Sequence, residues 1–102
     1  MAIIRGTTPT VVYTFKTVTP SEVNKAYLTV KQMNATIIER DITTAEVGET
    51  TLSWVLAQEE TLALSPQHDA VLCCDWKTND GKRGRSVIRK EKVENSGKNE
   101  VI

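Results

Sequence analysis

The stretch TLSWVLAQEETLAL, residues 51–64, decides how the rest of the chain is arranged. Its first half alternates and places Leu52, Trp54 and Leu56 on one face, which is typical of a half-buried β-strand. Its second half becomes polar at residues 58–60 and then apolar again. This pattern predicts a strand that leaves one sheet and an acidic corner that carries the chain towards another sheet.

Short strands separated by turns are predicted along the rest of the chain. Besides residues 52–56, the expected strands are an edge strand at Ile3 and Ile4 and residues 10–16, 26–32, 36–41, 70–78 and 83–93. Residues 33–35 and 79–82 carry Asn and Asn-Asp-Gly turn patterns, so the strands flanking each turn should be antiparallel neighbours. Because no long amphipathic helix appears, the pattern predicts an all-β sandwich or barrel.

The uncharged face of each expected strand supplies the predicted core. Within residues 70–78, for example, one face carries Asp75 and Lys77 and the other carries no charge. The predicted core residues are Val11, Tyr13, Phe15, Leu28, Val30, Leu52, Trp54, Leu56, Leu72, Cys74 and Trp76.

Length, charge and cysteine content narrow the class of protein. At 102 residues the chain is expected to form a single β-sandwich domain over residues 1–93, followed by a loosely ordered tail over residues 94–102. Thirteen basic residues balance thirteen acidic ones, which argues against nucleic acid or an anionic membrane as a partner. Cys73 and Cys74 are adjacent, so they suit neither an unstrained disulfide nor a zinc site. The sequence shows neither a membrane span nor a signal peptide.

No combination of residues predicts a catalytic, cofactor or metal site. His68, the single histidine, lies in an expected turn and accompanies no recognisable nucleophile. Glu59 and Glu60 are adjacent and lack a second carboxylate across a cleft, and residues 79–81 lack the alternating oxygen ligands of a calcium loop. A small enzyme would need a deep cleft lined by Glu59, His68 and Asp69.

The charges are distributed unevenly along the chain. Residues 36–70 hold seven acidic residues and one arginine, whereas residues 76–102 hold eight basic and four acidic residues. The basic run at residues 82–92 contains none of the aromatic residues on which nucleic-acid bases stack. It is therefore interpreted first as a charged edge strand that discourages sheet pairing, then as a docking surface for an acidic protein.

The predicted protein-contact residues are the exposed charges of these two regions. They are Glu46, Glu49, Glu59, Glu60, Arg83, Arg85, Arg89 and Lys90. An acidic corner formed by the four glutamates would meet the basic last strand of a neighbouring copy. Such a head-to-tail contact would produce rings or filaments and would weaken as the salt concentration rises.

Three segments carry a resemblance to a known family. They are IIRGTTPTVVYTF (residues 3–15), AYLTVKQ with IIERD (within residues 26–41) and LSWVLAQEETLAL (residues 52–64). In this order they resemble small proteins encoded among the tail genes of phages and prophages of Gram-positive bacteria, and the N-terminal module of siphophage baseplate upper proteins. The similarity extends to about Val93. It implies an immunoglobulin-like antiparallel β-sandwich of about six to eight strands, with no catalytic residues to carry over.

The resemblance implies a structural or assembly module of a phage or prophage tail, of the baseplate type. Its partners would be other tail or baseplate proteins or copies of itself, in the virion or in the host cytoplasm during assembly. Baseplate upper proteins continue into long receptor-facing regions, whereas this chain ends at Ile102, so a stand-alone accessory subunit is expected. The alternative is a ligand-binding sandwich for cell-wall carbohydrate or a host surface, with Tyr13 or Tyr27 as the aromatic platform.

Overall fold

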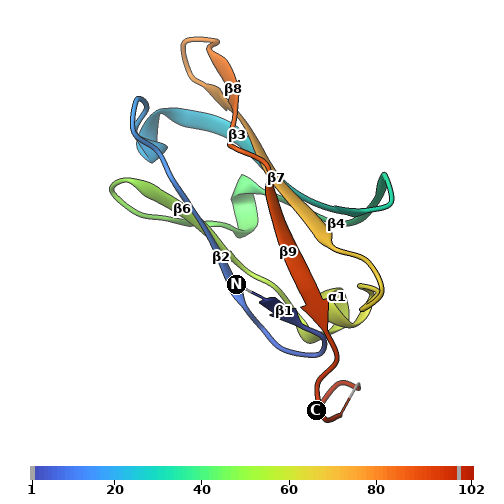
Figure 1. Cartoon of the computed structure of the whole chain (residues 1–102). Helices are drawn as coiled ribbons and strands as arrows, with labels where there is room; N and C mark the ends of the chain where they lie inside the picture. Colours follow the sequence, from blue (N-terminus) through green and yellow to red (C-terminus); the bar gives the residue numbers. More distant parts are fainter. Residues whose placement is uncertain (1, 99) are drawn as a thin grey trace.

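The chain folds as two β-sheets that pack face to face (Figure 1). The computed structural model describes residues 2–98 and 100–102. The strands are β1 (Ala2–Ile4), β2 (Thr10–Thr14), β3 (Val23–Gln32), β4 (Ala35–Asp41), β5 (Glu46–Val47), β6 (Thr51–Val55), β7 (Ala70–Thr78), β8 (Arg83–Arg85) and β9 (Arg89–Glu94). The helical turns are η1 (Pro20–Glu22), η2 (Ile42–Thr44) and α1 (Gln58–Leu62).

The larger sheet has the strand order β1-β9-β7-β3-β4, with β8 also paired to β7, and the smaller sheet has the order β2-β6-β5. Every pairing is antiparallel except that of β1 with β9. The predicted strand at residues 10–16 is shorter, and residues 42–49 contain a two-residue strand that the sequence did not indicate. A β-sandwich is therefore confirmed over a barrel.

The predicted crossing between the sheets occurs at α1. β6 belongs to the smaller sheet and β7 to the larger one, and the predicted acidic corner between them forms a short helix. The carboxylate of Glu60 accepts a hydrogen bond of 2.8 Å from the backbone N–H of Ala57, as an N3 glutamate does in a capping box. The hydroxyl of Thr61 donates to the carbonyl of Thr7 and accepts from the N–H of Gly6. The corner is thus fixed to the first loop of the chain.

One tight turn and one glycine within a strand shape the larger sheet. Met33 and Asn34 both have positive φ values, 51° and 65°, and form the two-residue turn that suits the twist of an antiparallel hairpin. Gly84 is needed for a different reason, because a Cβ atom there would lie 2.3 Å from the indole ring of Trp76. The close approach of that ring to the backbone of β8 therefore depends on glycine.

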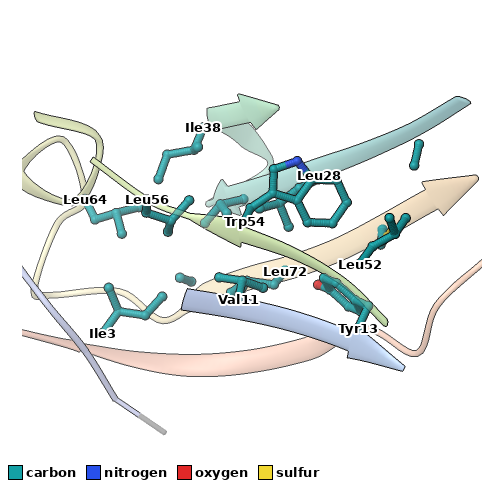
Figure 2. Close-up of a cluster of buried hydrophobic side chains, with 14 of the residues drawn as sticks. Ile3, Val11, Tyr13, Leu28, Ile38, Leu52, Trp54, Leu56, Leu64 and Leu72 are labelled. Carbon is teal, nitrogen blue, oxygen red and sulfur yellow. The ribbon is translucent and has the colours of Figure 1, made fainter. Parts of the chain in front are cut away.

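The core lies between the two sheets and is centred on Trp54 (Figure 2). All of the predicted core residues are buried except Phe15 and Trp76, which are only partly buried. These two rings pack edge to face, with centroids 5.9 Å apart, at one border of the core. The indole N–H of Trp54 donates to the carbonyl of Asp41 at 2.9 Å, so the only polar atom of this side chain is paired.

The core also contains residues that the sequence did not single out. They are Ile3, Val23, Ala26, Ile38, Leu64, Ala70 and Val93. Most lie near strand ends or in edge strands, where alternation is too short to assign a face.

The last strand differs from its prediction. Residues 83–93 were expected to form one strand centred on Val87 and Ile88, but residues 86–88 separate β8 from β9, and both side chains are exposed. The register on β7 shifts by one residue across the gap, which is the pattern of a β-bulge. The N–H of Cys74 donates to the Ser86 hydroxyl at 3.0 Å rather than to a strand carbonyl. This side-chain hydrogen bond takes the place of one backbone hydrogen bond between the strands.

The residues after β9 return to the crossing corner. The backbone N–H of Ile102 donates to the side-chain oxygen of Gln58 at 2.7 Å. Arg5 donates to the side chain of Asn95 and to the carbonyl of Leu62. The side chains of Val101 and Ile102 remain exposed.

Candidate protein-contact surface

The eight predicted contact residues do not form two faces. Glu46 and Glu49 lie on β5 and in the turn that precedes β6, whereas Glu59 and Glu60 lie on α1, which follows β6. Glu46 is opposite Ser53 in the middle of β6, Glu49 lies before the strand, and α1 follows it. The four glutamates are therefore spread along β6 and do not form the predicted single corner. On the basic side, β8 and β9 are separated by the bulge.

Two of the eight residues are engaged within the fold. Glu60 caps α1 and lies 3.6 Å from the guanidinium of Arg40. Arg89 donates to the carbonyl of Val12 at 3.0 Å, and its guanidinium lies 5.3 Å from the centroid of the Tyr13 ring. Both side chains are engaged by contacts within the fold, so they are structural.

A row of three cations crosses the outer face of the larger sheet. Lys25 on β3 is directly opposite Lys77 on β7, and Lys77 is directly opposite Arg83 on β8. Side chains of one row share a face, and like charges in directly opposite positions destabilise a sheet. The row therefore costs folding energy that the core does not require. We call Lys25, Lys77 and Arg83 the cationic row.

The cationic row borders a shallow hollow that also contains aromatic side chains. The hollow has a volume of about 280 Å³ and is lined by the row together with Tyr27, Asp75 and Trp76. Tyr27 lies opposite Asp75, and 42% of its surface is exposed. An exposed tyrosine among cations combines the residue types that are common in protein interfaces.

A second, smaller hollow adjoins the first and shares Asp75 with it. It has a volume of about 150 Å³ and includes Lys31, Arg85, Cys73 and Ile88 in its lining. The single carboxylate at the centre of both hollows is thus flanked by cations on β3 and on β8. The two hollows make one continuous and mainly cationic surface.

The two thiols are not activated for chemistry. Burial raises the pKa of Cys74 to about 12, and this residue lies in the core, as predicted. Burial, and then the neighbouring Asp75 carboxylate, raise the pKa of Cys73 as well. The thiolate is the reactive form of cysteine, so both environments disfavour a nucleophile.

The other residues considered for chemistry line none of the hollows described above. Glu59 belongs to α1, whereas His68 and Asp69 are exposed in the loop before β7. Over residues 2–98 and 100–102, no group of three or more His, Cys, Asp or Glu side chains could hold a metal ion. No helix in the same part of the chain is long and apolar enough to cross a membrane.

Sequence reasoning placed Arg83 among the contact residues but missed Lys25 and Lys77. The missing information is the register that brings three strands, distant in sequence, into one row. The available signal was weaker: Lys25 and Lys77 both occupy the polar phase of alternating strands, opposite predicted core positions. Tyr27 was considered only for the carbohydrate alternative.

Comparisons with known proteins show the fold. No protein-family model matches the chain, and no curated protein matches it. Among solved structures, it is similar to the immunoglobulin-like domain of mouse leukocyte-associated immunoglobulin-like receptor 1, crystallised as a strand-swapped dimer. The TM-score is 0.53 at 17% sequence identity, over 91% of this chain and 85% of that one. The chain is an all-β sandwich with an immunoglobulin-like fold.

Proposed function

We propose that this chain is a non-catalytic assembly module of a phage or prophage tail, of the baseplate type, and acts through protein–protein contacts. The family resemblance of residues 3–64 supports the setting, and the immunoglobulin-like sandwich provides a rigid scaffold. The observation that carries the proposal is the cationic row of Lys25, Lys77 and Arg83.

The cationic row is matched to an acidic partner surface. An opposing row of carboxylates would relieve the repulsion between the three cations and would pair with each of them. Tyr27 and Arg83 are of the residue types that most often contribute the largest share of binding energy at interfaces. The partner is therefore a tail or baseplate protein that presents acidic side chains around an apolar point of contact.

Incorporation into tail particles tests this function. The tail gene cluster would be expressed with either the wild-type chain or Lys77→Glu, and purified particles would be analysed by mass spectrometry for this chain. We expect Lys77→Glu to be lost from the particles. Lys98→Glu, which makes the same charge change in the tail of the chain, should be incorporated normally. Absence of the wild-type chain from particles and from assembly intermediates would contradict the proposal.

The ligand-binding alternative is favoured by one observation, the exposed ring of Tyr27 beside a hollow. Tyr13, the other predicted platform, is buried. Binding to purified Gram-positive cell walls would separate the two functions. A carbohydrate site would lose binding on Tyr27→Ala and keep it on Lys77→Glu, whereas the assembly module should show no specific binding to cell walls.

A further inference from the structure

One edge of the smaller sheet is unpaired. β2 pairs with β6 on one side only, and the bonds from Phe15 N–H to Thr50 C=O and from Leu56 N–H to Pro9 C=O fix the alternation. The odd-numbered residues of β2 therefore bond to β6, so the backbone groups of Thr10, Val12 and Thr14 point outwards. Among the described residues, the only partner of this edge is Arg89, which donates to the Val12 carbonyl.

The unpaired edge of β2 borders a groove with an apolar lining and a positive charge. The groove has a volume of about 520 Å³ and includes Phe15, Trp76 and Val87 in its lining, the last of these 84% exposed. Its other lining residues include Lys16, Arg85 and Arg89, and no carboxylate from the described part of the chain is among them. The groove suits an extended segment that carries an apolar side chain next to an acidic one.

The opposite edge of the same sheet carries such a segment. Within residues 2–98 and 100–102, β5 pairs only with β6. The bond from Gly48 N–H to Thr51 C=O sets its alternation, so the backbone groups of Val47 point away from β6. Val47 is opposite the buried Leu52, which places its side chain on the inner side of the sheet, yet it is 51% exposed. Glu46 and Glu49 on either side of it are exposed.

We propose that a second copy of this chain docks its β5 edge onto the β2 edge, so that the smaller sheet continues from one copy to the next. Both strands are antiparallel to β6, so the new pairing would be parallel. The incoming Val47 would accept from Thr14 N–H and donate to Val12 C=O, whose second lone pair is available beside the Arg89 bond.

This register also aligns the side chains. The incoming Val47 lies beside Tyr13 and enters the apolar groove, because both residues are on the inner side of their sheets. The incoming Glu49 then lies towards Lys16 and Arg85. A second copy is favoured over another protein because the unpaired edge, the apolar side chain and the opposite charge all occur on this one molecule.

The contact joins two different edges, so each copy of a pair retains one unused edge, β5 on one copy and β2 on the other. Repetition would build rings or open filaments. Since the β5 strand is two residues long and the charges lie at the rim, the association is expected to be weak and sensitive to salt. The groove shares Trp76 and Arg85 with the lining of the two hollows but includes none of Lys25, Lys77 and Arg83. Lys77→Glu therefore tests the cationic row without changing a residue of the groove.

Sedimentation velocity of the purified chain tests the proposal. In low salt we expect species larger than the 11.3 kDa monomer, growing with protein concentration and dissociating as salt is raised. Thr14→Pro should abolish them, because it removes an outward N–H that the fold does not use, a position where edge strands tolerate proline. Arg85→Glu, an exposed substitution on β8, reverses a charge of the groove without changing the β2 backbone and should also abolish the larger species.

The β5 edge is tested with Val47→Lys/Glu49→Lys, and Glu59→Lys, which makes the same reversal as Glu49→Lys, is the control on α1. The double variant should weaken association by at least about tenfold, because it places like charges against the groove. Glu59→Lys should associate as the wild type does. Equal losses in the two variants would indicate general charge effects and would overturn the proposal.

A mixture of the two damaged edges gives the sharpest result. Thr14→Pro retains β5, and Val47→Lys/Glu49→Lys retains the β2 edge, so the mixture should form dimers and nothing larger. A mixture that remains monomeric would overturn the proposal, as would one that assembles as far as the wild type. A wild-type chain that is monomeric in low salt at its highest soluble concentration would also overturn it, even if acidic peptides bound the groove.

Discussion

Two arginines connect the larger sheet to the smaller one at opposite sides of the sandwich, and only one of these sides is closed. Arg40 on β4 donates to the carbonyl of Val55 and pairs with Glu60 of α1. Arg89 on β9 donates to the carbonyl of Val12 and lies 3.5 Å from the carboxylate of Glu91.

The difference lies in what covers each arginine. The crossing helix covers the first, whereas the second borders the open groove along β2. A hydrogen bond from an arginine to a strand carbonyl is therefore covered by a helix on one side, and on the other side it leaves the strand edge accessible.

On the open side, the free energy of unfolding should be sensitive to a larger side chain at Gly84. Gly84→Val would place a branched side chain where the indole ring of Trp76 lies, forcing that ring away from Phe15. We expect a loss of about 2–3 kcal/mol in the free energy of unfolding, measured by denaturant titration, which is the usual cost of overpacking. Gly97→Ala, with no atom within 4 Å of the added Cβ, should have almost no effect.

The closed side should depend on Arg40. Arg40→Met would keep the apolar stem but leave the Val55 carbonyl without its donor and the partly buried Glu60 without its cation. The expected cost is about 2 kcal/mol in the free energy of unfolding. The folded fraction of this variant should self-associate as strongly as the wild type, because Arg40 does not line the groove. A variant that unfolds as easily as before would show that α1 closes this side without the arginine.

Tyr13, beneath Arg89 on the open side, should make the protein sensitive to alkali. Burial raises its pKa from 10 to about 12, against the lowering effect of the Arg89 charge. The folded protein therefore holds the phenolic proton more tightly, and this stability is present below pH 10 and is lost as the pH rises through about 12. Between pH 9 and 11 the loss should be about 1 kcal/mol, and Tyr13→Phe should lose correspondingly less than the wild type.

A substitution in the cationic row should stabilise the fold, whereas the substitutions on the two sides of the sandwich should destabilise it. Lys77→Glu would replace two repulsions by attractions and should raise the free energy of unfolding by about 0.2–1 kcal/mol. The same variant is expected to be lost from tail particles. A gain in stability together with normal incorporation would show that the row has no role in docking.

Alternation made the strand faces and most of the core predictable from the sequence. Leu28 and Val30 on one strand and Leu52 and Trp54 on another occupy the inner face that their spacing indicates. Phe15 and Trp76 share that spacing but lie at the border of the core. Their exposure depends on which strand covers them, and a single segment does not contain that information.

The bulge and the charge groupings could not be read from the sequence for the same reason. The break at residues 86–88 depends on the Ser86 hydroxyl reaching the backbone of β7, a contact between separate strands. The cationic row likewise exists only once β3, β7 and β8 are in register. Sequence reasoning found the charges and placed the acidic ones in a single corner because it followed chain order.

The parallel pairing of β1 with β9 has a mechanical consequence. The first and last strands lie side by side and run in the same direction, and the bond from Arg5 N–H to the Glu94 carbonyl extends their ladder. Tension that pulls the start of β1 away from the end of β9 acts along the strands. The bonds of the ladder are then loaded in shear and must break together, whereas an antiparallel pair pulled from one end would open one bond at a time.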